Sequence, residues 1–173
     1  MISKLHPERW HGEYVYGEGY PESVAGQAAP FEIDITCADN NHFTGFCYDD
    51  ISRRMEGIPA AIEGYIENDS IYFTKRYAYA TYMSENGFSW AFPNRPSHDV
   101  HYTGNWYGDM YAGEWEIFTL VKDVDGSYVE QYCAGTWFIR KVLPETLQDR
   151  KRTNAMALLN KFFKRIFGKK DTY

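Results

Sequence analysis

The chain has 173 residues, enough for one domain with a substantial core, and its formal net charge is −6. The acidic excess lies in residues 1–144, so the main body would repel phosphates, which argues against nucleic acid as a partner. The odd number of cysteines, 3, indicates reduced thiols. Because the first ten residues contain no apolar stretch typical of a signal peptide, we expect a cytoplasmic protein.

From residue 10 to residue 140, apolar and polar side chains alternate with a period of two, which predicts strands. Turn signals separate eight of them, at 10–20, 30–37, 42–49, 59–67, 70–77, 98–106, 111–122 and 127–141. Such a series is typical of a closed antiparallel barrel or a sandwich. We favour an up-and-down barrel, because an open sheet leaves two edges to protect.

Short turns fix the expected pairing of neighbouring strands. Asn68-Asp69 and Gly108-Asp109 predict two-residue hairpins. With a longer loop around Gly126, the predicted partners are Ile62 with Lys75, Tyr102 with Trp115, Gly104 with Gly113, Gly113 with Trp137, and Trp115 with Gly135. Several glycines therefore face aromatic rings, which can lie over the missing side chain while the strand coils to close the barrel.

The connections between these strands alternate between two ends of the predicted barrel. One end receives the connections 21–29, 50–58, 78–97 and 123–126, and three of these four are long. The other end receives only the tight turns 38–41, 68–69 and 107–110. We therefore expect an open mouth and a closed floor, with the long loops available for function.

The aromatic segment 78–98 is too apolar for a simple solvated loop. Its residues Phe88, Trp90 and Phe92 are candidates for a lid over the mouth. Contact with another subunit and packing against the barrel rim are the two alternatives.

The eight-strand meander resembles calycin-like barrels. Two short motifs add to this resemblance: "WHGEY" at the start of the first strand and "GTWFIRK" at the end of the last. Calycin-like barrels include lipocalins, fatty-acid-binding proteins and avidins, and the last strand is similar to the Gly-Thr-Trp pattern of avidin-type barrels. Arg140 is loosely similar to a late lipocalin arginine that packs on a tryptophan, here Trp10. The resemblance implies a mostly β, ligand-binding barrel and names no ligand.

The inward face becomes polar near the mouth, where Lys75 interrupts an apolar run and needs a partner or water. Glu18 and Asp49 are the candidate partners. The candidate ligand-binding residues are Tyr16, Glu18, Asp49, Lys75, Tyr77, Tyr102 and Trp115. Lys75 would orient the polar head of a small, partly apolar ligand. Alternatively, an ion pair fills the core, since barrels of eight strands are only just wide enough for side chains to fill them, although some hold one small ligand.

No nucleophile elbow, phosphate loop or dinucleotide fingerprint is present, so we assign no catalytic residue and no cofactor. His98 and His101 are three residues apart, which places them on opposite faces of a strand, and we assign no metal site. Non-catalytic binding is the favoured function. An enzyme that uses Glu18, Asp49 and Lys75 for acid–base chemistry stays as an alternative.

The C-terminal segment differs from the barrel domain predicted for 1–143. Pro144 and "TLQD" predict the start of an amphipathic helix over 144–168, followed by a tail at 169–173. Residues 145–173 hold 8 Lys and Arg against 3 Asp and Glu, a net charge of +5. The helix could pack on its own acidic barrel or a neighbour's in a homo-oligomer, bind an anionic membrane surface, or dock in a partner's groove. In the last two cases the chain is an interaction or membrane-associated module that acts through this helix and the 78–98 loop.

Overall fold

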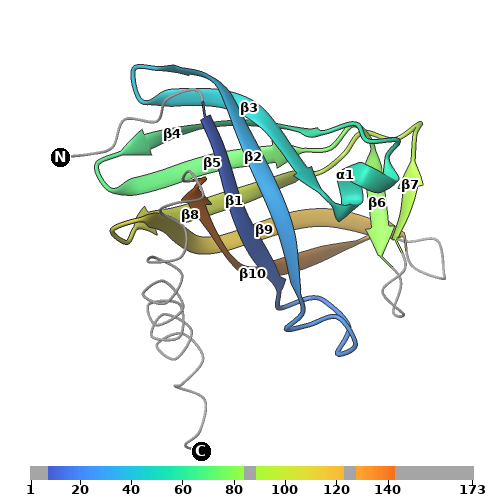
Figure 1. Cartoon of the computed structure of the whole chain (residues 1–173). Coiled ribbons are helices and arrows are strands. Elements are labelled where there is room, and N and C mark those ends of the chain that lie inside the picture. Colours follow the sequence, from blue (N-terminus) through green and yellow to red (C-terminus); the bar gives the residue numbers. More distant parts are fainter. Residues whose placement is uncertain (1–7, 84–88, 123–127, 143–173) are drawn as a thin grey trace, which may run out of the picture. The chain divides into compact units, whose positions relative to one another are not determined.

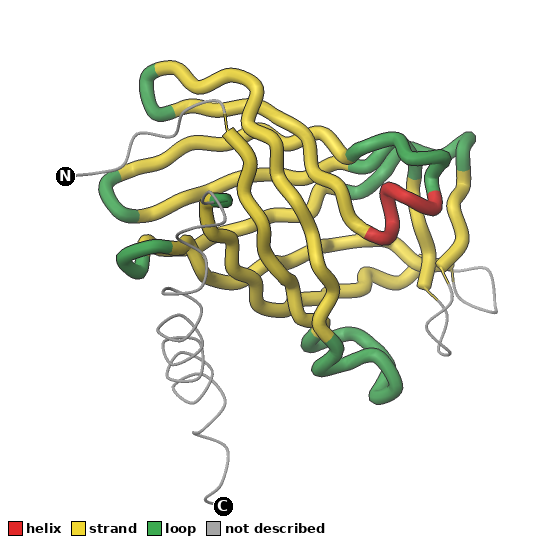
Figure 2. The backbone as a smooth tube through the Cα atoms, in the orientation of Figure 1, coloured by secondary structure: helices red, strands yellow, loops and turns green. Residues whose placement is uncertain are grey.

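The computed structural model describes residues 8–83, 89–122 and 128–142. Eight strands in this part of the chain form a closed antiparallel barrel (Figure 1 and Figure 2). Their order around it is β1 (Glu8–Tyr16), β10 (Tyr128–Lys141), β9 (Met110–Lys122), β8 (Asp99–Trp106), β5 (Ser70–Arg76), β4 (Ala60–Glu67), β3 (His42–Asp49) and β2 (Ala28–Asp39). The predicted up-and-down barrel is confirmed, while the predicted C-terminal helix lies outside the described residues.

The predicted registers also hold. Ile62 lies opposite Lys75 between β4 and β5. Between β8 and β9, Tyr102 faces Trp115 and Gly104 faces Gly113. Side chains alternate in and out along each strand, so the apolar face lines the inside of the barrel. Aromatic and branched aliphatic residues make up most of this core, among them Trp10, Phe31, Ile33, Phe43, Ile62, Ile71, Phe73, Tyr102, Trp115, Trp137 and Ile139.

Two tryptophans explain the glycines inside the strands. The Trp115 indole lies over Gly135 and donates a hydrogen bond to the Val15 carbonyl, 3.2 Å away, on the strand beyond. A Cβ at position 135 would lie only 2.6 Å from Trp115 Nε1. Trp137 crosses Gly104 in the same way and donates to the main chain of β8 at 3.0 Å. Each missing side chain thus lets an indole tie together three neighbouring strands.

The two ends of the barrel differ as expected. Tight turns at Asn40–Asn41, Asn68–Asp69 and Tyr107–Asp109 close the floor, and Gly108 takes the positive φ of +85° that a type II′ turn requires. The mouth carries the longer connections (Figure 1).

Two of those longer connections contain elements that the periodicity did not predict. A short helix, α1 (Asp50–Arg54), follows β3, and a two-stranded hairpin, β6 (Ala80–Met83) with β7 (Ser89–Phe92), follows β5. No helix in the described ranges has the length and apolar character to span a bilayer.

Candidate functional site

A buried ion pair lies inside the mouth of the barrel. Lys75 occupies an inward position of β5, and Asp49 is the last residue of β3. The Lys75 ammonium is 3.1 Å from Asp49 Oδ2, and their side chains are 3% and 0% exposed. β3 and β5 are not neighbours, because β4 lies between them, so the pair reaches across the interior. Of the two predicted partners of Lys75, Asp49 is the one that the structure brings to it.

Two further hydrogen bonds hold the Asp49 carboxylate. The Tyr77 hydroxyl donates to Oδ2 at 2.5 Å, and the Ser52 amide donates to Oδ1 at 2.8 Å. Asp49 is the N-cap of α1, and the Ser52 hydroxyl oxygen accepts from the Asp49 amide at 2.8 Å, which completes a capping box. The first turn of α1 therefore fixes the carboxylate in front of the ammonium.

Tyrosine rings surround the ammonium on its other sides. The Lys75 Nζ atom lies 5.0 Å from the ring centre of Tyr14, 4.9 Å from that of Tyr77 and 5.4 Å from that of Tyr102. At these distances the negative faces of the rings attract the cation. The ion pair is thus solvated by protein groups in place of water.

A continuous row of rings leads from this cage toward the mouth. The hydroxyl groups of Tyr14 and Tyr16 are 3.2 Å apart, and Tyr16 packs against Tyr20 with ring centres 4.8 Å apart. Trp115 packs against Tyr20 from the neighbouring side, at 5.9 Å. Tyr16 and Tyr20 are only partly buried, so the aromatic wall reaches the surface.

Burial and charge fix the protonation state of each group. Burial alone would raise the pKa of the Asp49 carboxyl, but Lys75 and the hydrogen bonds from Tyr77 and Ser52 outweigh it and keep that pKa below its ordinary value. Burial alone would lower the pKa of the Lys75 ammonium, but the hydroxyl groups and the carboxylate around it hold that pKa well above its ordinary value. Burial raises the pKa of Tyr102 to about 12. At neutral pH the site therefore contains a cation, an anion and neutral phenols.

Glu18 does not belong to this cluster, and the prediction that it faces inward is wrong. The side chain is exposed in the connection between β1 and β2. β1 ends at Tyr16, four residues before the predicted end, and Gly19 has a φ of +82°. The alternation that places inward residues applies only within a strand, so it fails beyond Tyr16.

The predicted lid residues are only partly covered by the structure. Phe92, at the end of β7, is 42% exposed, and the Arg95 guanidinium lies over its ring at 5.7 Å. Phe88 and the side chain of Trp90 lie outside the described residues. A lid at 78–98 therefore stays a prediction.

Sequence reasoning missed two contributors to the site. Ser52 was assigned to a loop, although the spacing Asp-x-x-Ser in "DDIS" is a capping signal. Tyr20 follows the end of β1, where no periodic signal exists. Tyr16, Tyr77, Tyr102 and Trp115 do line the mouth and the cage, as their strand positions predict.

The floor does not reproduce the lipocalin-like pairing of Arg140 with Trp10. Trp10 packs against Trp106 and Tyr111, with ring centres 6.4 Å and 6.1 Å away. Arg140 lies over the Phe138 ring at 5.3 Å. This arrangement seals the floor with aromatic side chains.

No protein-family model and no curated protein matches the chain. Among solved structures, the bradavidin2–biotin complex matches with a TM-score of 0.45 and 16% identity, covering 80% of this chain and 99% of that chain. Apo bradavidin2 in its form B matches with a TM-score of 0.47 and 15% identity, over the same shares. What the strand order shows is a closed antiparallel barrel of eight strands. At this level the likeness concerns the barrel alone and carries no residue of the site.

Proposed function

We propose that the mouth of this barrel binds a small, partly apolar molecule without transforming it, and that the polar head of this ligand faces Lys75. The observation that carries the proposal is the buried Lys75–Asp49 pair at the inner end of an aromatic wall. Removing two charges from water is costly, and apolar side chains of similar volume would fill a barrel at least as stably. A ligand that contacts the pair explains its presence better than an ion pair that only fills the core does.

The hydrogen-bonding valences indicate what kind of head group fits. Asp49 already accepts from Lys75, Tyr77 and the Ser52 amide. An ammonium donates three hydrogen bonds, and its carboxylate partner takes one of them. The Tyr77 hydroxyl proton is already donated to Asp49, and the hydroxyl groups of Tyr14 and Tyr16 share one hydrogen bond. The ammonium keeps donor capacity beyond its bond to Asp49, so the matching ligand presents acceptors, as a carbonyl or carboxylate oxygen does, on an aromatic or aliphatic body.

The protonation states give less support to an enzyme. The pKa of Asp49 is shifted further below neutral pH and that of Lys75 further above it, so neither group gives up or takes a proton readily at neutral pH. Glu18, the third member of the alternative acid–base group, is exposed outside the cluster.

Three probes that differ only in their head group test the proposal: 3-phenylpropanamide, 3-phenylpropanoate and 3-phenylpropylamine. We expect ligand-observed NMR on the full chain to detect the amide or the carboxylate and to find the amine at least about tenfold weaker, or about 1.4 kcal/mol. Equal binding of all three would remove the role of Lys75, and no binding of any would count against the pocket.

Two tyrosine variants locate the binding. Tyr16→Ala removes part of the wall at the mouth, and Tyr65→Ala removes a ring on the outer face of β4, where Tyr65 is 40% exposed. Only the first substitution is expected to weaken binding. A comparable loss in Tyr65→Ala would place the probe outside the barrel.

A further inference from the structure

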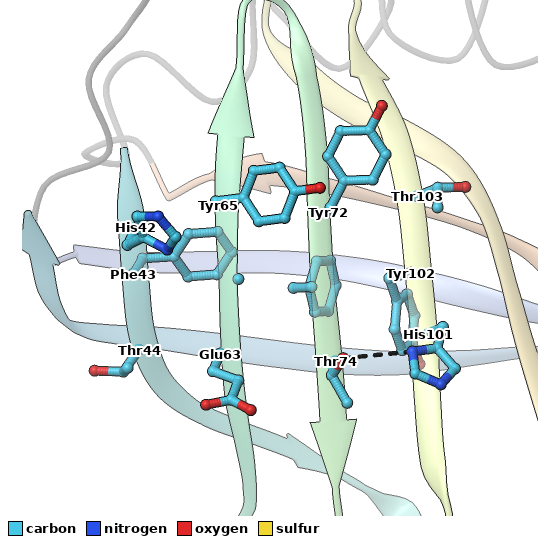
Figure 3. Close-up of a pocket in the computed structure, with 12 residues that line it drawn as sticks. His42, Phe43, Thr44, Glu63, Tyr65, Tyr72, Thr74, His101, Tyr102 and Thr103 are labelled. Atoms are coloured by element: carbon cyan, nitrogen blue, oxygen red, sulfur yellow. Dashed lines mark hydrogen bonds between the residues drawn. The ribbon is translucent and has the colours of Figure 1, made fainter. Parts of the chain in front are cut away.

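The outer face of β3, β4, β5 and β8 carries a groove of about 480 Å³ (Figure 3). The described residues that line it include no lysine, arginine, leucine, isoleucine or valine. Its outward-pointing side chains lie in two rows across the strands, because directly paired residues on neighbouring strands lie side by side. The strand registers therefore fix which chemical groups meet in the groove.

The aromatic row consists of His42, Tyr65 and Tyr72, which lie side by side on β3, β4 and β5. The two tyrosine rings stack with their centres 5.0 Å apart and an angle of 20° between their planes, and the His42 ring centre is 5.8 Å from that of Tyr65. Figure 3 looks onto this outer face and shows both tyrosine rings with a face toward the viewer. Because Tyr65 is 40% exposed, the pair forms an open, flat platform.

The polar row consists of Thr44, Glu63, Thr74 and His101, which lie side by side on β3, β4, β5 and β8. It runs beside the aromatic row, two residues or about 7 Å along each strand. The Thr74 hydroxyl and His101 Nδ1 are 3.4 Å apart, and within the described residues no group forms a hydrogen bond with the Glu63 carboxylate. Hydroxyl, imidazole and carboxylate groups thus line one edge of an apolar platform.

Hydrogen-bond acceptors, and no available cation, border the described part of the platform. Glu63 lies in the polar row, and Glu116 on β9 lies opposite His101. Arg76, further along β5, is already engaged, because it donates to both carboxylate oxygens of Asp99 at 2.6 Å and 2.7 Å. The groove therefore disfavours an anion, whereas its carboxylates accept strong hydrogen bonds from hydroxyl donors.

We propose that this groove binds a neutral oligosaccharide of pyranose units. The face of a pyranose that carries only C–H groups is apolar and lies on the tyrosine platform, while the hydroxyl groups around the ring edge reach the polar row. From β3 to β8 the rows cross four strands, or about 14 Å at about 4.8 Å per strand, so more than one sugar unit fits. The proposal is independent of the ligand at the mouth.

Two other ligand classes fit the groove less well. An organic cation is held best where rings surround it, as three tyrosines surround the Lys75 ammonium, but Tyr65 and Tyr72 lie side by side on one surface. A purely apolar ligand would displace water from the polar row without replacing its hydrogen bonds. A ligand with an apolar face and many hydroxyl groups satisfies both rows.

A two-dimensional NMR titration of the folded full-length protein with cellotetraose and mannotetraose tests the proposal. We expect at least one sugar to shift the signals of Tyr65, Tyr72 and His101 in a saturable manner at millimolar concentration, and to leave that of the Trp115 indole in place. Sorbitol, which has the hydroxyl groups but no ring face, should shift none of them at the same concentration. No shift with either sugar, equal shifts with sorbitol, or shifts confined to Trp115 would overturn the proposal.

Three variants test which side chains hold the sugar. Tyr72→Ala removes half of the platform, and Thr74→Val removes one hydroxyl of the polar row at nearly the same volume, so each should weaken binding severalfold. Phe118→Ala is the control, because its ring is 60% exposed on β9 outside the groove, and it should leave the affinity unchanged. If Tyr72→Ala does not fold, Thr74→Val decides alone. An unchanged affinity in the folded variants of the groove, or an equal loss in Phe118→Ala, would contradict the assignment.

Two further probes separate the sugar from other ligands of the platform. Caffeine is a flat, neutral heteroaromatic molecule, and choline is an organic cation. Both should bind at Tyr65 and Tyr72 more weakly than the better of the two sugars. Tighter binding of either probe would assign the groove to that class of ligand and overturn the proposal.

Discussion

The Lys75 ammonium lies 3.1 Å from the Asp49 carboxylate, and the pair joins β5 to the end of β3 through the interior of the barrel. Because Asp49 also caps α1, the same contact sets the position of the first turn after β3. The pair therefore has two consequences: it contributes to stability as a connection between strands, and it places a cation at the inner end of the mouth.

Replacing Lys75 by Met should lower the free energy of unfolding by about 3–5 kcal/mol, because Asp49 would remain buried without its counter-charge. Urea unfolding measures the change. The neighbouring Arg76→Met is the matched control: its pair with Asp99 is exposed, and such pairs contribute about 0–1 kcal/mol.

A double substitution separates the pair from the packing of its side chains. Asp49→Asn combined with Lys75→Met removes both charges, so most of the lost stability should return. If Lys75→Met alone cost less than about 1 kcal/mol, the ammonium would not be held as the structure places it.

The free energy of unfolding at acid pH should depend on Asp49. Its pKa is lowered in the folded protein, so its contribution is present above the unfolded pKa of about 3.9 and is lost as pH falls through the folded value. The unfolding free energy of the wild type should therefore fall more steeply below about pH 4 than that of the Asp49→Asn, Lys75→Met protein. Parallel profiles for the two proteins would refute the assignment.

The registers of the β4–β5 and β8–β9 hairpins could be predicted because a two-residue turn leaves one pairing, and that pairing placed Lys75 and Tyr102 on the inner face. The contact with Asp49 could be proposed only as one of two, because it depends on how two non-adjacent strands approach across the interior. Glu18 was misplaced because strand ends carry no periodic signal. Ser52 lay in a short helix whose only signal was its cap.

Cys47 should be inert toward alkylation in the native protein. The side chain is fully buried beside the ion pair, and burial raises the pKa of its thiol to about 12, so almost no thiolate exists at pH 8. Mass spectrometry after iodoacetamide treatment should find Cys47 unmodified in buffer and modified in urea. Rapid modification in buffer would mean that the interior opens far more often than this packing implies.

Gly135→Ala should destabilise the barrel and disturb its mouth together. The new Cβ would meet first the Val15 carbonyl oxygen of β1 and then the Trp115 indole, which lies across this position, and overpacking of this kind costs at least about 1–3 kcal/mol. Displacement of the indole breaks its hydrogen bond to the Val15 carbonyl. Thermal unfolding measures the first effect, and the chemical shift of the Trp115 Nε1 proton reports the second. An unchanged shift would show that the indole does not depend on the glycine.

The most direct measurement is a two-dimensional NMR titration of the folded full-length protein with small aromatic carboxylates and amides at millimolar concentration. We expect at least one compound to shift the signals of the Trp115 indole and of Tyr16 and Tyr20, and to leave those of the outer-face Tyr65 in place. If no compound moves the mouth signals while the protein stays folded, the Lys75–Asp49 pair is a plug in a filled barrel, and the proposed binding function is wrong.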